Sequence, residues 1–513
     1  MQPALPLSRP LLAHRSVERL KLTLTQRRWL ALVMLLGGAL RIFSWARPGL
    51  HPDEALYASW ALRIADGSDP ALLGVYVDKP PFLLYSLAAL FRLAGFNGTI
   101  PPDTAWLVLV GRSAALAASL TSLALLWLIA RRVYGAHTAL IATTLFALSP
   151  LAARLSTTLF TDPWLLLWVL LGVWAALDGR IWLAGVAAGL AYATKQQALL
   201  FLPLLFGLTL MATPRRTRAA WAWLNGAGLI VVLVLWWDSL RWQWLPSYWE
   251  RSVTTYGGLA WATPANWPEH LRQWAELLGF GLGWPLWLAV GVLLGWGWRA
   301  GRATPSPASA PARRFDHILA LFVGLYLLLH WVTNLAAWDR YALLILPFLF
   351  LLLARAMVWA WARPLPQHRR RWALVLLVAG GLSAAGLALR PTLFVADGGQ
   401  YDRVPALARQ LRVPTAAIVY HHQLGWHFNF YLYGDDAELR WWADPADLAG
   451  KAVVATDQPQ FIAVQSFDEA AAVRDALQDA GLILVPTSPV KPLAEPLTLY
   501  RILPAPAVAH HGR

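Results

Sequence analysis

Cysteine is absent from this 513-residue sequence, and charged residues make up only 14% of it. Without cysteine the chain has no disulfide framework and no thiolate chemistry, so the sequence does not reveal its redox compartment. So few charges, together with 58% hydrophobic residues and a mean hydropathy of +0.47, exclude an ordinary soluble domain. The composition therefore predicts an α-helical polytopic membrane protein.

Two further signatures are missing. The formal net charge of +15 would suit a nucleic-acid partner, but most Lys and Arg lie in short clusters between apolar runs, where the positive-inside rule explains them. We therefore expect no nucleic acid. The first 24 residues contain basic side chains but no apolar core with a small-residue cleavage site, so we expect no cleavable signal. The first span is predicted to stay as an anchor.

Apolar runs are what the sequence has in abundance. Windows of about 17 to 25 apolar residues, with some shorter ones, predict about eleven membrane spans. They are Trp29–Trp45, Trp106–Ala130, Ala136–Ala153, Pro163–Leu177, Ile181–Ala193, Ala198–Met211, Ala219–Leu240, Leu277–Trp298, Ile318–Ala337, Tyr341–Ala362 and Trp372–Leu389. The arginine clusters fall on one side only if Pro80–Leu93 does not span, so we expect that stretch to be interfacial or re-entrant and the amino terminus to be cytoplasmic.

This map predicts three regions. They are a cytoplasmic segment 1–28, a multi-spanning domain 29–390 with outer loops 46–105 and 241–276 and a cytoplasmic linker 299–316, and an extracytoplasmic region 391–513. In the last region a small α/β domain is expected. Its predicted strands are Ala416–Tyr420, Phe428–Tyr433, Ile483–Pro486 and Leu497–Ile502, and its predicted helix is Asp468–Ala480.

The first outer loop carries an acidic pair at the start of a predicted helix. Apolar residues recur at helical spacing over Leu56–Ile64, and Pro52 suits a first helical turn. Asp53 and Glu54 then lie beside the positive end of the helix dipole, which favours ionised carboxylates that can accept a proton. We expect this helix to lie along the membrane. Ordinary helix caps are the alternative.

A second pattern in the same loop suits an anion. Pro80 and Pro81 begin another predicted helix, so Lys79 stands just before free backbone N–H groups. A cation beside a helix N-terminus can bind phosphate, with an ordinary loop charge as the alternative.

Several short motifs follow one another along the chain: Asp53-Glu54-x-x-Tyr57, Asp78-Lys79-Pro80-Pro81-x-x-x-Tyr85, Arg154 with Thr161-Asp162-Pro163, Thr194-Lys195, and Asp339-Arg340-Tyr341 ahead of Leu346-Pro347. This ordered set resembles the GT-C glycosyltransferases, in the branch that contains protein O-mannosyltransferases and the lipid A aminoarabinose transferase (glycosyltransferase family 39). They run in order from about Arg41 to Arg355. The family often has Glu before Lys-Pro, whereas this chain has Asp78.

The resemblance implies a function and roles for these residues. In the family the first outer loop carries the essential acidic residue and the donor is a sugar on polyprenyl phosphate. That implies Asp53 as the catalytic carboxylate, with Glu54 beside it, and Lys79 for the lipid phosphate. The implied partners are this donor, the bilayer, and a lipid, glycan or protein acceptor. The sequence has no glycine-rich nucleotide loop, which also favours a lipid-linked donor.

The chemistry can be argued from the reactants. A lipid phosphate is already a good leaving group, so the harder step is activation of the incoming hydroxyl by a general base. Negative charge then builds on the departing phosphate, where Lys79 with Arg340 or Arg154 would stabilise it. Direct attack predicts inversion at the anomeric carbon.

Four residues later in the chain are candidates for the active site, and some of them also have an ordinary structural explanation. Asp162 is a candidate catalytic group, although Asp followed by Pro also suits a helix start. Lys195 is a candidate for donor phosphate, although terminal Lys often only snorkels. Arg340 suits bidentate phosphate binding, and Tyr341 fits either the donor site or the interfacial aromatic belt.

Metal chemistry has little support. His51 with Asp53 and Glu54 lacks the spacing of metal ligands, so we expect no cofactor and no tightly bound metal, leaving room only for a weakly bound divalent cation. His421, His422 and His427 are expected in an exposed turn, and His510-His511 in a disordered end.

Three rival classes share the polytopic architecture. A transporter or lipid flippase would show charges in mid-span and two related halves, and we find neither. A polysaccharide polymerase or ligase would differ mainly in its acceptor. A non-catalytic subunit of an envelope-glycan assembly complex would not need Asp53.

Overall fold

The computed structural model describes residues 22–43, 45, 49–256, 258–300, 310–390, 401–412, 416–455, 457–464, 467–487 and 497–505. Contacts divide the chain into two compact units. Unit 1 contains Met1–Ala46, Asp69–Ser86 and Gly111–Phe394, and unit 2 contains Arg47–Ser68, Leu87–Val110 and Val395–Arg513. Parts of the predicted outer loop 46–105 therefore group with the carboxy-terminal region.

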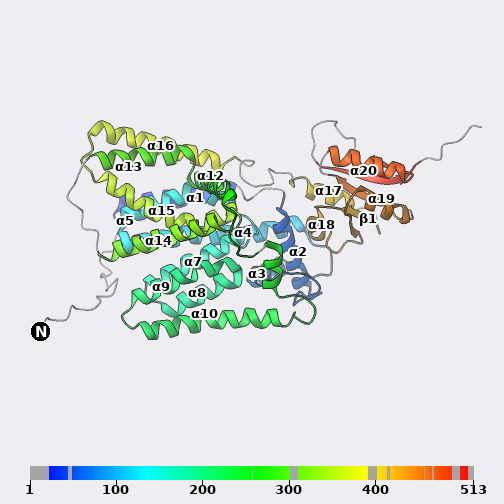
Figure 1. The fold of residues 1–513 in the computed structure, drawn as a ribbon, viewed down its shortest axis with the longest axis horizontal. Coiled ribbons are helices and arrows are strands. Elements are labelled where there is room, and N and C mark those ends of the chain that lie inside the picture. Colours follow the sequence, from blue (N-terminus) through cyan, green and yellow to red (C-terminus); the bar gives the residue numbers. More distant parts are fainter. Residues whose placement is uncertain are drawn as a thin grey trace, which may run out of the picture. The chain divides into compact units, whose positions relative to one another are not determined.

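Unit 1 is helical (Figure 1). Its helices are α1 (Leu24–Phe43), most of α4 (Thr104–Tyr134), α5 (Ala136–Leu148), α6 (Pro150–Leu155), α7 (Asp162–Leu177), α8 (Ile181–Thr194), η2 (Gln196–Leu200), α9 (Leu202–Ala212), α10 (Arg216–Ser239), α11 (Tyr248–Tyr256), η3 (Pro264–Asn266), α12 (Trp267–Leu282), α13 (Trp284–Arg299), α14 (Ala310–Val332), α15 (Asp339–Trp361) and α16 (Gln367–Ala388). Helices α7, α8, α9 and α10 pack side by side.

Among the described residues, five helices are long and apolar enough to cross a membrane: α4, α10, α14, α15 and α16. A bent helix pair would make six, and five further apolar helices have 10–17 residues: α3 (Phe82–Leu93), α5, α7, α8 and α9. The polytopic helical class is confirmed, while the number of eleven spans stays a prediction. With 12 residues, α3 rises about 18 Å, which is too short for a hydrocarbon core of about 30 Å.

The predicted continuous span Leu277–Trp298 is wrong. The chain breaks at Gly283 between α12 and α13, and the two helices lie at 87° to each other. Gly283 has φ +82°, and Pro285 stands in the first turn of α13. The glycine at positive φ ends the first helix and the proline starts the second. Hydropathy alone does not register such a break.

This break gives a stability prediction. Gly283→Ala is expected to destabilise the protein by about 1–2 kcal/mol, because an L-residue resists positive φ. The nearest atoms to an added Cβ lie at 3.4 Å or more, so conformational strain rather than a clash is the cause. Gly291→Ala is the control, since that glycine is inside α13 with nothing within 4 Å of an added Cβ. Thermal unfolding in detergent measures both, and equal melting temperatures would contradict the prediction.

The predicted span Ala136–Ala153 is also interrupted. Helix α5 ends at Leu148, Ser149 has φ −59° and ψ 116°, and α6 begins at Pro150. The Ser149 hydroxyl accepts from the Ala152 N–H and donates to the Gly281 carbonyl at 2.5 Å. A serine cap followed by proline is a helix start inside the apolar run.

Unit 2 combines the outer-loop segments with an α/β region. Its elements are α2 (Pro52–Asp66), most of α3, the start of α4, α17 (Val404–Leu411), β1 (Ile418–His421), α18 (Gly425–Tyr431), β2 (Glu438–Trp441), α19 (Pro445–Val454), β3 (Gln460–Val464), α20 (Phe467–Asp479), β4 (Leu482–Pro486) and β5 (Thr498–Pro504). The sheet order is β2-β1-β3-β5-β4, with β1 parallel to β2 and β3, and β5 antiparallel to β3 and β4.

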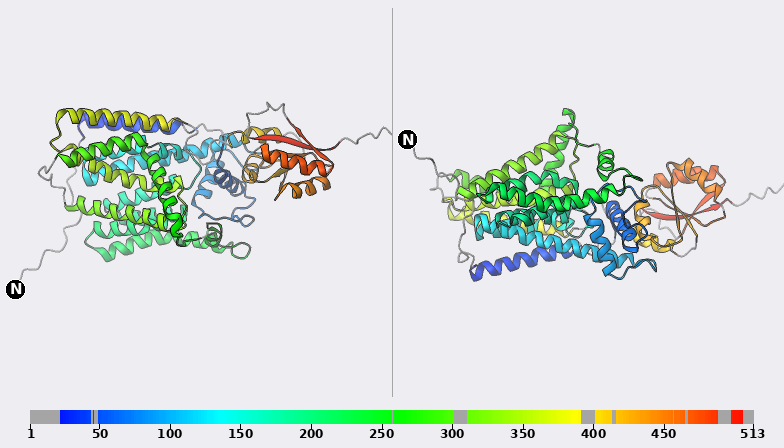
Figure 2. Two further views of the ribbon diagram at one scale, coloured as in Figure 1. Left: turned by 45° about the horizontal axis from the view of Figure 1, so that its top comes forward. Right: turned by 90° about the horizontal axis from the view of Figure 1, so that it is seen from below.

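The core of the α/β region lies between one sheet face and two helices. Ile418 and Ile462 of the sheet pack with Leu448 of α19 and with Val473 and Leu477 of α20. Figure 2 shows α20, in orange, lying across the sheet. The predicted small α/β domain is thus present.

One prediction for secondary structure is wrong. Phe428–Tyr433 was expected as a strand, but Gly425–Tyr431 forms α18, whose Phe428 and Phe430 are buried. Within the predicted linker 299–316, α13 runs to Arg299 and α14 begins at Ala310, while 301–309 lie outside the described residues, so the linker stays a prediction. Helix α2, which was expected along the membrane, is largely buried and packs on α18, and its placement at the membrane stays a prediction.

Candidate functional site

The segment 69–81, which carries Asp78 and Lys79, is fastened to the end of α10. The Arg241 guanidinium donates to the carbonyls of Leu72 at 3.1 Å and Val75 at 3.0 Å. Arg241 is itself buried and lies 3.6 Å from an Asp238 carboxylate oxygen. Because the anchor is fully buried, the position of the segment is fixed by the fold.

Lys79 is buried and held on two sides. Its ammonium contacts the Asp78 carboxylate at 2.5 Å and donates to the Tyr256 hydroxyl at 3.0 Å, with the ammonium 4.6 Å from the centre of that ring. The Tyr256 hydroxyl also donates to the Asp78 carboxylate at 3.0 Å. Asp78 and Tyr256 together thus fix the position of the Lys79 ammonium.

Helix α11 places Tyr256. At the other end of α11, Tyr248 donates its N–H to Asp238 at 3.1 Å and its hydroxyl lies 2.7 Å from that of Tyr192 in α8. Tyr256 was not among the candidate site residues predicted from the sequence. The loop 241–276 is so rich in aromatics that nothing in the sequence separates this tyrosine from an interfacial belt.

Asp162 and Lys195 form a second buried pair. Their contact is 2.7 Å, and both side chains are at most 7% exposed. Asp162 begins α7 and also accepts from the Thr161 hydroxyl at 3.3 Å. Lys195 follows α8, and its ammonium lies 4.9 Å from the centre of the Tyr341 ring.

The two pairs lie in one neighbourhood. Burial lowers the pKa of Lys195 to about 8, Asp162 opposes this shift, and the positive charges of Arg340 and Lys79 add to it. Gln196, the residue after Lys195, donates to the backbone carbonyl of Asp78 at 2.7 Å. Unit 1 therefore gathers three predicted cations from three distant parts of the sequence.

Arg340 and Arg154 have different surroundings. The Arg340 guanidinium lies 4.5 Å from the Phe160 ring centre and 5.6 Å from that of Trp338. Arg154 is buried, and its guanidinium donates to the Arg390 carbonyl at 2.7 Å. That bond connects α6 to the end of α16.

In unit 2 the acidic pair begins α2, with Pro52 in the first turn as predicted. The Asp53 N–H donates to the His51 ring at 3.1 Å, and the His51 N–H donates to the Glu54 carboxylate at 2.8 Å. This reciprocal cap buries Glu54, whereas Asp53 is partly exposed. Tyr57 is buried, with its ring centre 6.0 Å from that of Trp60.

His427 is fully buried, so the expectation that it belongs to an exposed turn is wrong. Its Nε2 lies 3.0 Å from the Leu50 carbonyl, and its ring stacks on Tyr401 at 4.6 Å. His510 and His511 lie outside the described residues. Among the residues that the structure describes, no group of three metal-ligating side chains is present.

Burial lowers the pKa of His427 to about 4, with the Leu50 carbonyl and Glu54 opposing and His51 adding to the shift. In the unfolded chain this histidine has a pKa near 6.5. Between about pH 6.5 and pH 4 the histidine is therefore protonated in the unfolded chain but not in the folded one. We expect the fold to lose up to about 3 kcal/mol across this window.

Thermal unfolding of the whole protein between pH 7 and pH 4.5 measures this loss. His427→Gln should flatten the pH dependence, and His422→Gln, at an exposed histidine of the same region, should leave it intact. An unchanged slope in His427→Gln would contradict the assignment.

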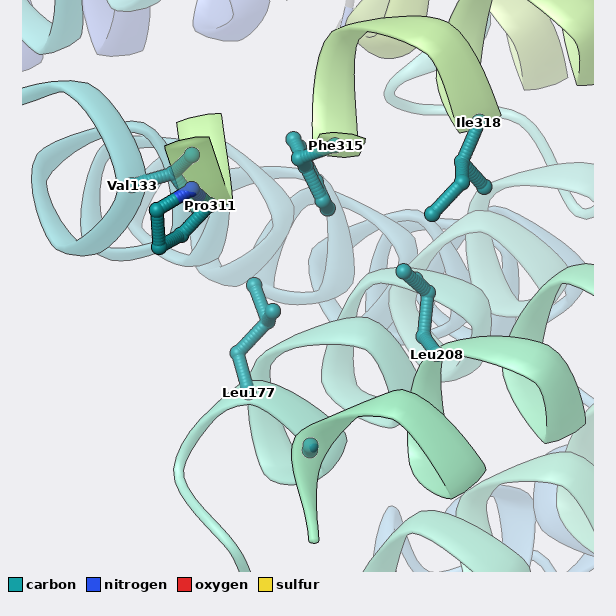
Figure 3. Close-up of a pocket in the computed structure, with 7 residues that line it drawn as sticks. Val133, Leu177, Leu208, Pro311, Phe315 and Ile318 are labelled. Atoms are coloured by element: carbon teal, nitrogen blue, oxygen red, sulfur yellow. The ribbon is translucent and has the colours of Figure 1, made fainter. Parts of the chain in front are cut away.

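Two apolar cavities lie elsewhere in unit 1. One of about 20 Å³ is lined by carbon atoms of α4, α7, α9 and α14, among them Val133, Leu208 and Phe315 (Figure 3). The other, of about 280 Å³, is lined by residues such as Leu145 and Leu286. Neither cavity is lined by a predicted site residue.

Comparison with known proteins finds similarity in the part of the chain that contains Lys79, Asp162 and Lys195. The family model described as dolichyl-phosphate-mannose-protein mannosyltransferase matches residues 78–237. The undecaprenyl phosphate-alpha-4-amino-4-deoxy-L-arabinose arabinosyl transferase of Pseudomonas aeruginosa (strain LESB58) is 28% identical over 279 residues, covering 49% of this chain and 47% of that protein. The chain thus spans about half the length of the curated relatives it matches.

Solved structures share the fold. ArnT from Cupriavidus metallidurans, bound to undecaprenyl phosphate, superposes with a TM-score of 0.58 over 92% of this chain and 98% of that one, at 17% identity. The Archaeoglobus fulgidus oligosaccharyltransferase in its apo form matches with a TM-score of 0.50 over 89% and 72%, at 12% identity.

These matches show that the chain shares its fold with membrane glycosyltransferases of the GT-C type. In sequence it is similar to the dolichyl-phosphate-mannose-protein mannosyltransferase family over residues 78–237 and to the undecaprenyl-phosphate aminoarabinose transferases over about half of its length. The resemblance seen in the sequence motifs is confirmed.

Proposed function

We propose that this protein transfers a sugar from a polyprenyl-phosphate donor to an acceptor hydroxyl on the extracytoplasmic face of the membrane. The observation that carries the proposal is the buried Lys79, held by Asp78 and Tyr256 in the neighbourhood of Lys195 and Arg340. A buried ammonium is costly unless it is paired, and Asp78 offsets that cost here until a donor phosphate can share the ammonium. The relative crystallised with undecaprenyl phosphate supports the choice of donor.

Lys79 is assigned to the donor phosphate. In the substrate-free protein it rests on Asp78, and a phosphate oxygen takes over part of that contact when the donor binds. As the glycosidic bond to the phosphate breaks, charge grows on the leaving oxygen, and a preorganised ammonium stabilises that charge without reorganising. Lys195 and Arg340 supply further positive potential, while Asp162 holds Lys195 in place.

Asp53 is assigned as the general base. Glu54 is buried in the helix cap and Asp162 is buried against Lys195, so an acceptor reaches these two carboxylates less readily than a partly exposed one. Asp53 is partly exposed in the first turn of α2, next to the positive end of the helix dipole. It removes the proton from the acceptor hydroxyl as the oxygen attacks the anomeric carbon. A single displacement inverts the configuration there.

A donor panel tests the proposal. Purified protein in lipid is given labelled polyprenyl-phosphate sugars together with membranes that supply lipid, glycan and protein acceptors. Transfer of one sugar with inverted anomeric configuration is the expected result. Retained configuration would point to a double displacement through an enzyme carboxylate. Binding of a donor without transfer, combined with its movement across liposomes, would instead identify a flippase.

A further inference from the structure

Helix α2, which carries Asp53, packs against α18 of the carboxy-terminal region, and both belong to unit 2 (Figure 1). The first of these helices lies near the start of the chain and the second some 370 residues later, as the separation of 377 between Leu50 and His427 shows. The proposed chemistry uses no residue of the carboxy-terminal region. The contacts of this region with α2 indicate a structural role for it.

The amino-terminal end of α2 is held by His427. The His427 Nε2–H donates to the carbonyl of Leu50, the residue before the cap, at 3.0 Å, and both residues are fully buried. The opposite ring nitrogen, Nδ1, is buried without a hydrogen-bond partner, so the ring presents one donor to one acceptor. Tyr401 stacks on the ring and fixes its plane.

The chain just before Leu50 is equally confined. A Cβ on Gly49 would lie 2.8 Å from the Asp402 Cα and from the Tyr401 carbonyl carbon. Real Cβ atoms do not approach backbone so closely, so this position requires glycine. The segment entering α2 is therefore pressed directly onto the chain that precedes α17.

The carboxy-terminal end of α2 is held by Tyr433, which follows α18. Its hydroxyl donates to the Asp66 carboxylate at 2.6 Å and lies 3.3 Å from the Ser68 hydroxyl. Its ring packs edge-on against Phe96 with ring centres 6.2 Å apart. Arg92 adds a bond from its Nε to the Ala65 carbonyl. His427 within α18 and Tyr433 just after it thus hold the two ends of α2.

At the amino-terminal end of α2, a series of hydrogen bonds connects His427 to the segment that carries Asp53. His427 holds Leu50, the next residue His51 accepts from the Asp53 N–H, and the His51 N–H donates to Glu54. A shift of α18 along α2 would move this whole cap. Asp53 would move with it.

We propose that the carboxy-terminal region is a positioning element for α2, with His427 and Tyr433 as positioning residues that set the placement of Asp53. The proposal rests on the proposed function of Asp53 as the base. Proton transfer requires hydrogen-bond reach between base and hydroxyl, so a loosened α2 lowers turnover without touching the donor phosphate site.

The test compares two variants that remove one polar contact each. His427→Phe keeps a ring against Tyr401 but loses the donor to Leu50, and Tyr433→Phe keeps the ring against Phe96 but loses the hydroxyl. Each is expected to lower kcat, by up to roughly 10²-fold for His427→Phe, with the donor KM nearly unchanged. Amide hydrogen exchange of Asp53–Ala58 should rise in both.

Controls separate positioning from loss of fold. His427→Gln, which places an N–H near the position of Nε2, should restore much of kcat, and His422→Gln should behave as wild type. Normalising to folded protein removes changes in yield. If His427→Phe does not fold, Tyr433→Phe decides. Wild-type kcat and wild-type exchange in both variants would overturn the proposal, as would a fall in kcat that merely follows the folded fraction.

A double variant separates this proposal from the proposed function. On an Asp53→Asn background, His427→Phe should cause no further loss of transfer, because the group it positions is gone. If Asp53→Asn alone keeps wild-type transfer, the assignment of the base is wrong. The exchange measurement on α2 needs no activity, so it still tests the contact between the carboxy-terminal region and α2.

Discussion

Asp53→Asn is expected to reduce sugar transfer by roughly 10²–10⁴-fold, the usual contribution of a general base. Asparagine has nearly the same size and leaves the backbone N–H of residue 53 free to bond His51, so the helix cap should persist. Only the ability to accept a proton is lost. Donor binding should remain, because the cations assigned to the phosphate belong to other segments of the chain.

Transfer rate and donor binding are measured on the same preparation. Asp479→Asn is the matched control, since it neutralises an exposed carboxylate in α20. Near-wild-type transfer by Asp53→Asn would remove this residue from the chemical step and return attention to Glu54 and Asp162. Loss of both transfer and donor binding would show that Asp53 serves the donor rather than the proton.

Lys79→Met is expected to weaken donor binding by about 10- to 100-fold, the value of one charge-assisted contact. The substitution keeps an unbranched side chain of similar length and removes only the ammonium. It also leaves the Asp78 carboxylate without its cation, so some loss of stability is expected. The double variant with Asp78→Asn removes that second effect.

Donor affinity is measured by titration with the polyprenyl-phosphate sugar found to be active. Lys451→Met is the matched control, because Lys451 forms its ion pair with Asp447 within α19. The pattern of kinetics discriminates between roles. A rise in donor KM supports phosphate binding in the ground state, whereas a lower kcat at unchanged KM would place Lys79 in the transition state alone.

The helical framework follows from the sequence where apolar runs are long and uninterrupted. Helices α10, α15 and α16 match predicted spans because their apolar stretches exceed the membrane thickness and contain few charges. The bend at Gly283 is missed because a hydropathy window averages over it. The sequence Gly283-Trp284-Pro285 does contain a signal for this bend, because glycine often ends a helix and proline often stands in the first turn of the next one.

The carboxy-terminal region shows where alternation misleads. Phe428 and Phe430 alternate with polar neighbours, which favours a strand, yet they lie in α18. Tertiary contacts with α2 outweigh the local preference. For the same reason the burial of His427 is invisible in the sequence, because the residue that it meets is Leu50, far away along the chain.

The charged residues of the candidate site could be predicted from the sequence, but the residues that hold them in place could not. Asp78 and Lys79, and separately Asp162 and Lys195, were singled out because they stand in short motifs at the ends of apolar runs. The pairing of Asp162 with Lys195, 33 residues apart, was not predicted. Tyr256 and Arg241 were missed because their partners lie more than 160 residues away. Long-range side-chain partners leave no periodic signal in a single sequence.

The bond between His427 and Leu50 also has a consequence for the order of synthesis. The two residues are separated by 377 positions, which at about 5–20 residues per second corresponds to roughly 20–75 s on the ribosome. During that time the nascent chain already contains the acidic helix, but not the histidine and tyrosine that hold its ends. A chain that ends before His427 has complete membrane helices, but its acidic helix lacks the contacts of His427 and Tyr433. Placement of the acidic helix thus depends on residues that are made after the last membrane helix.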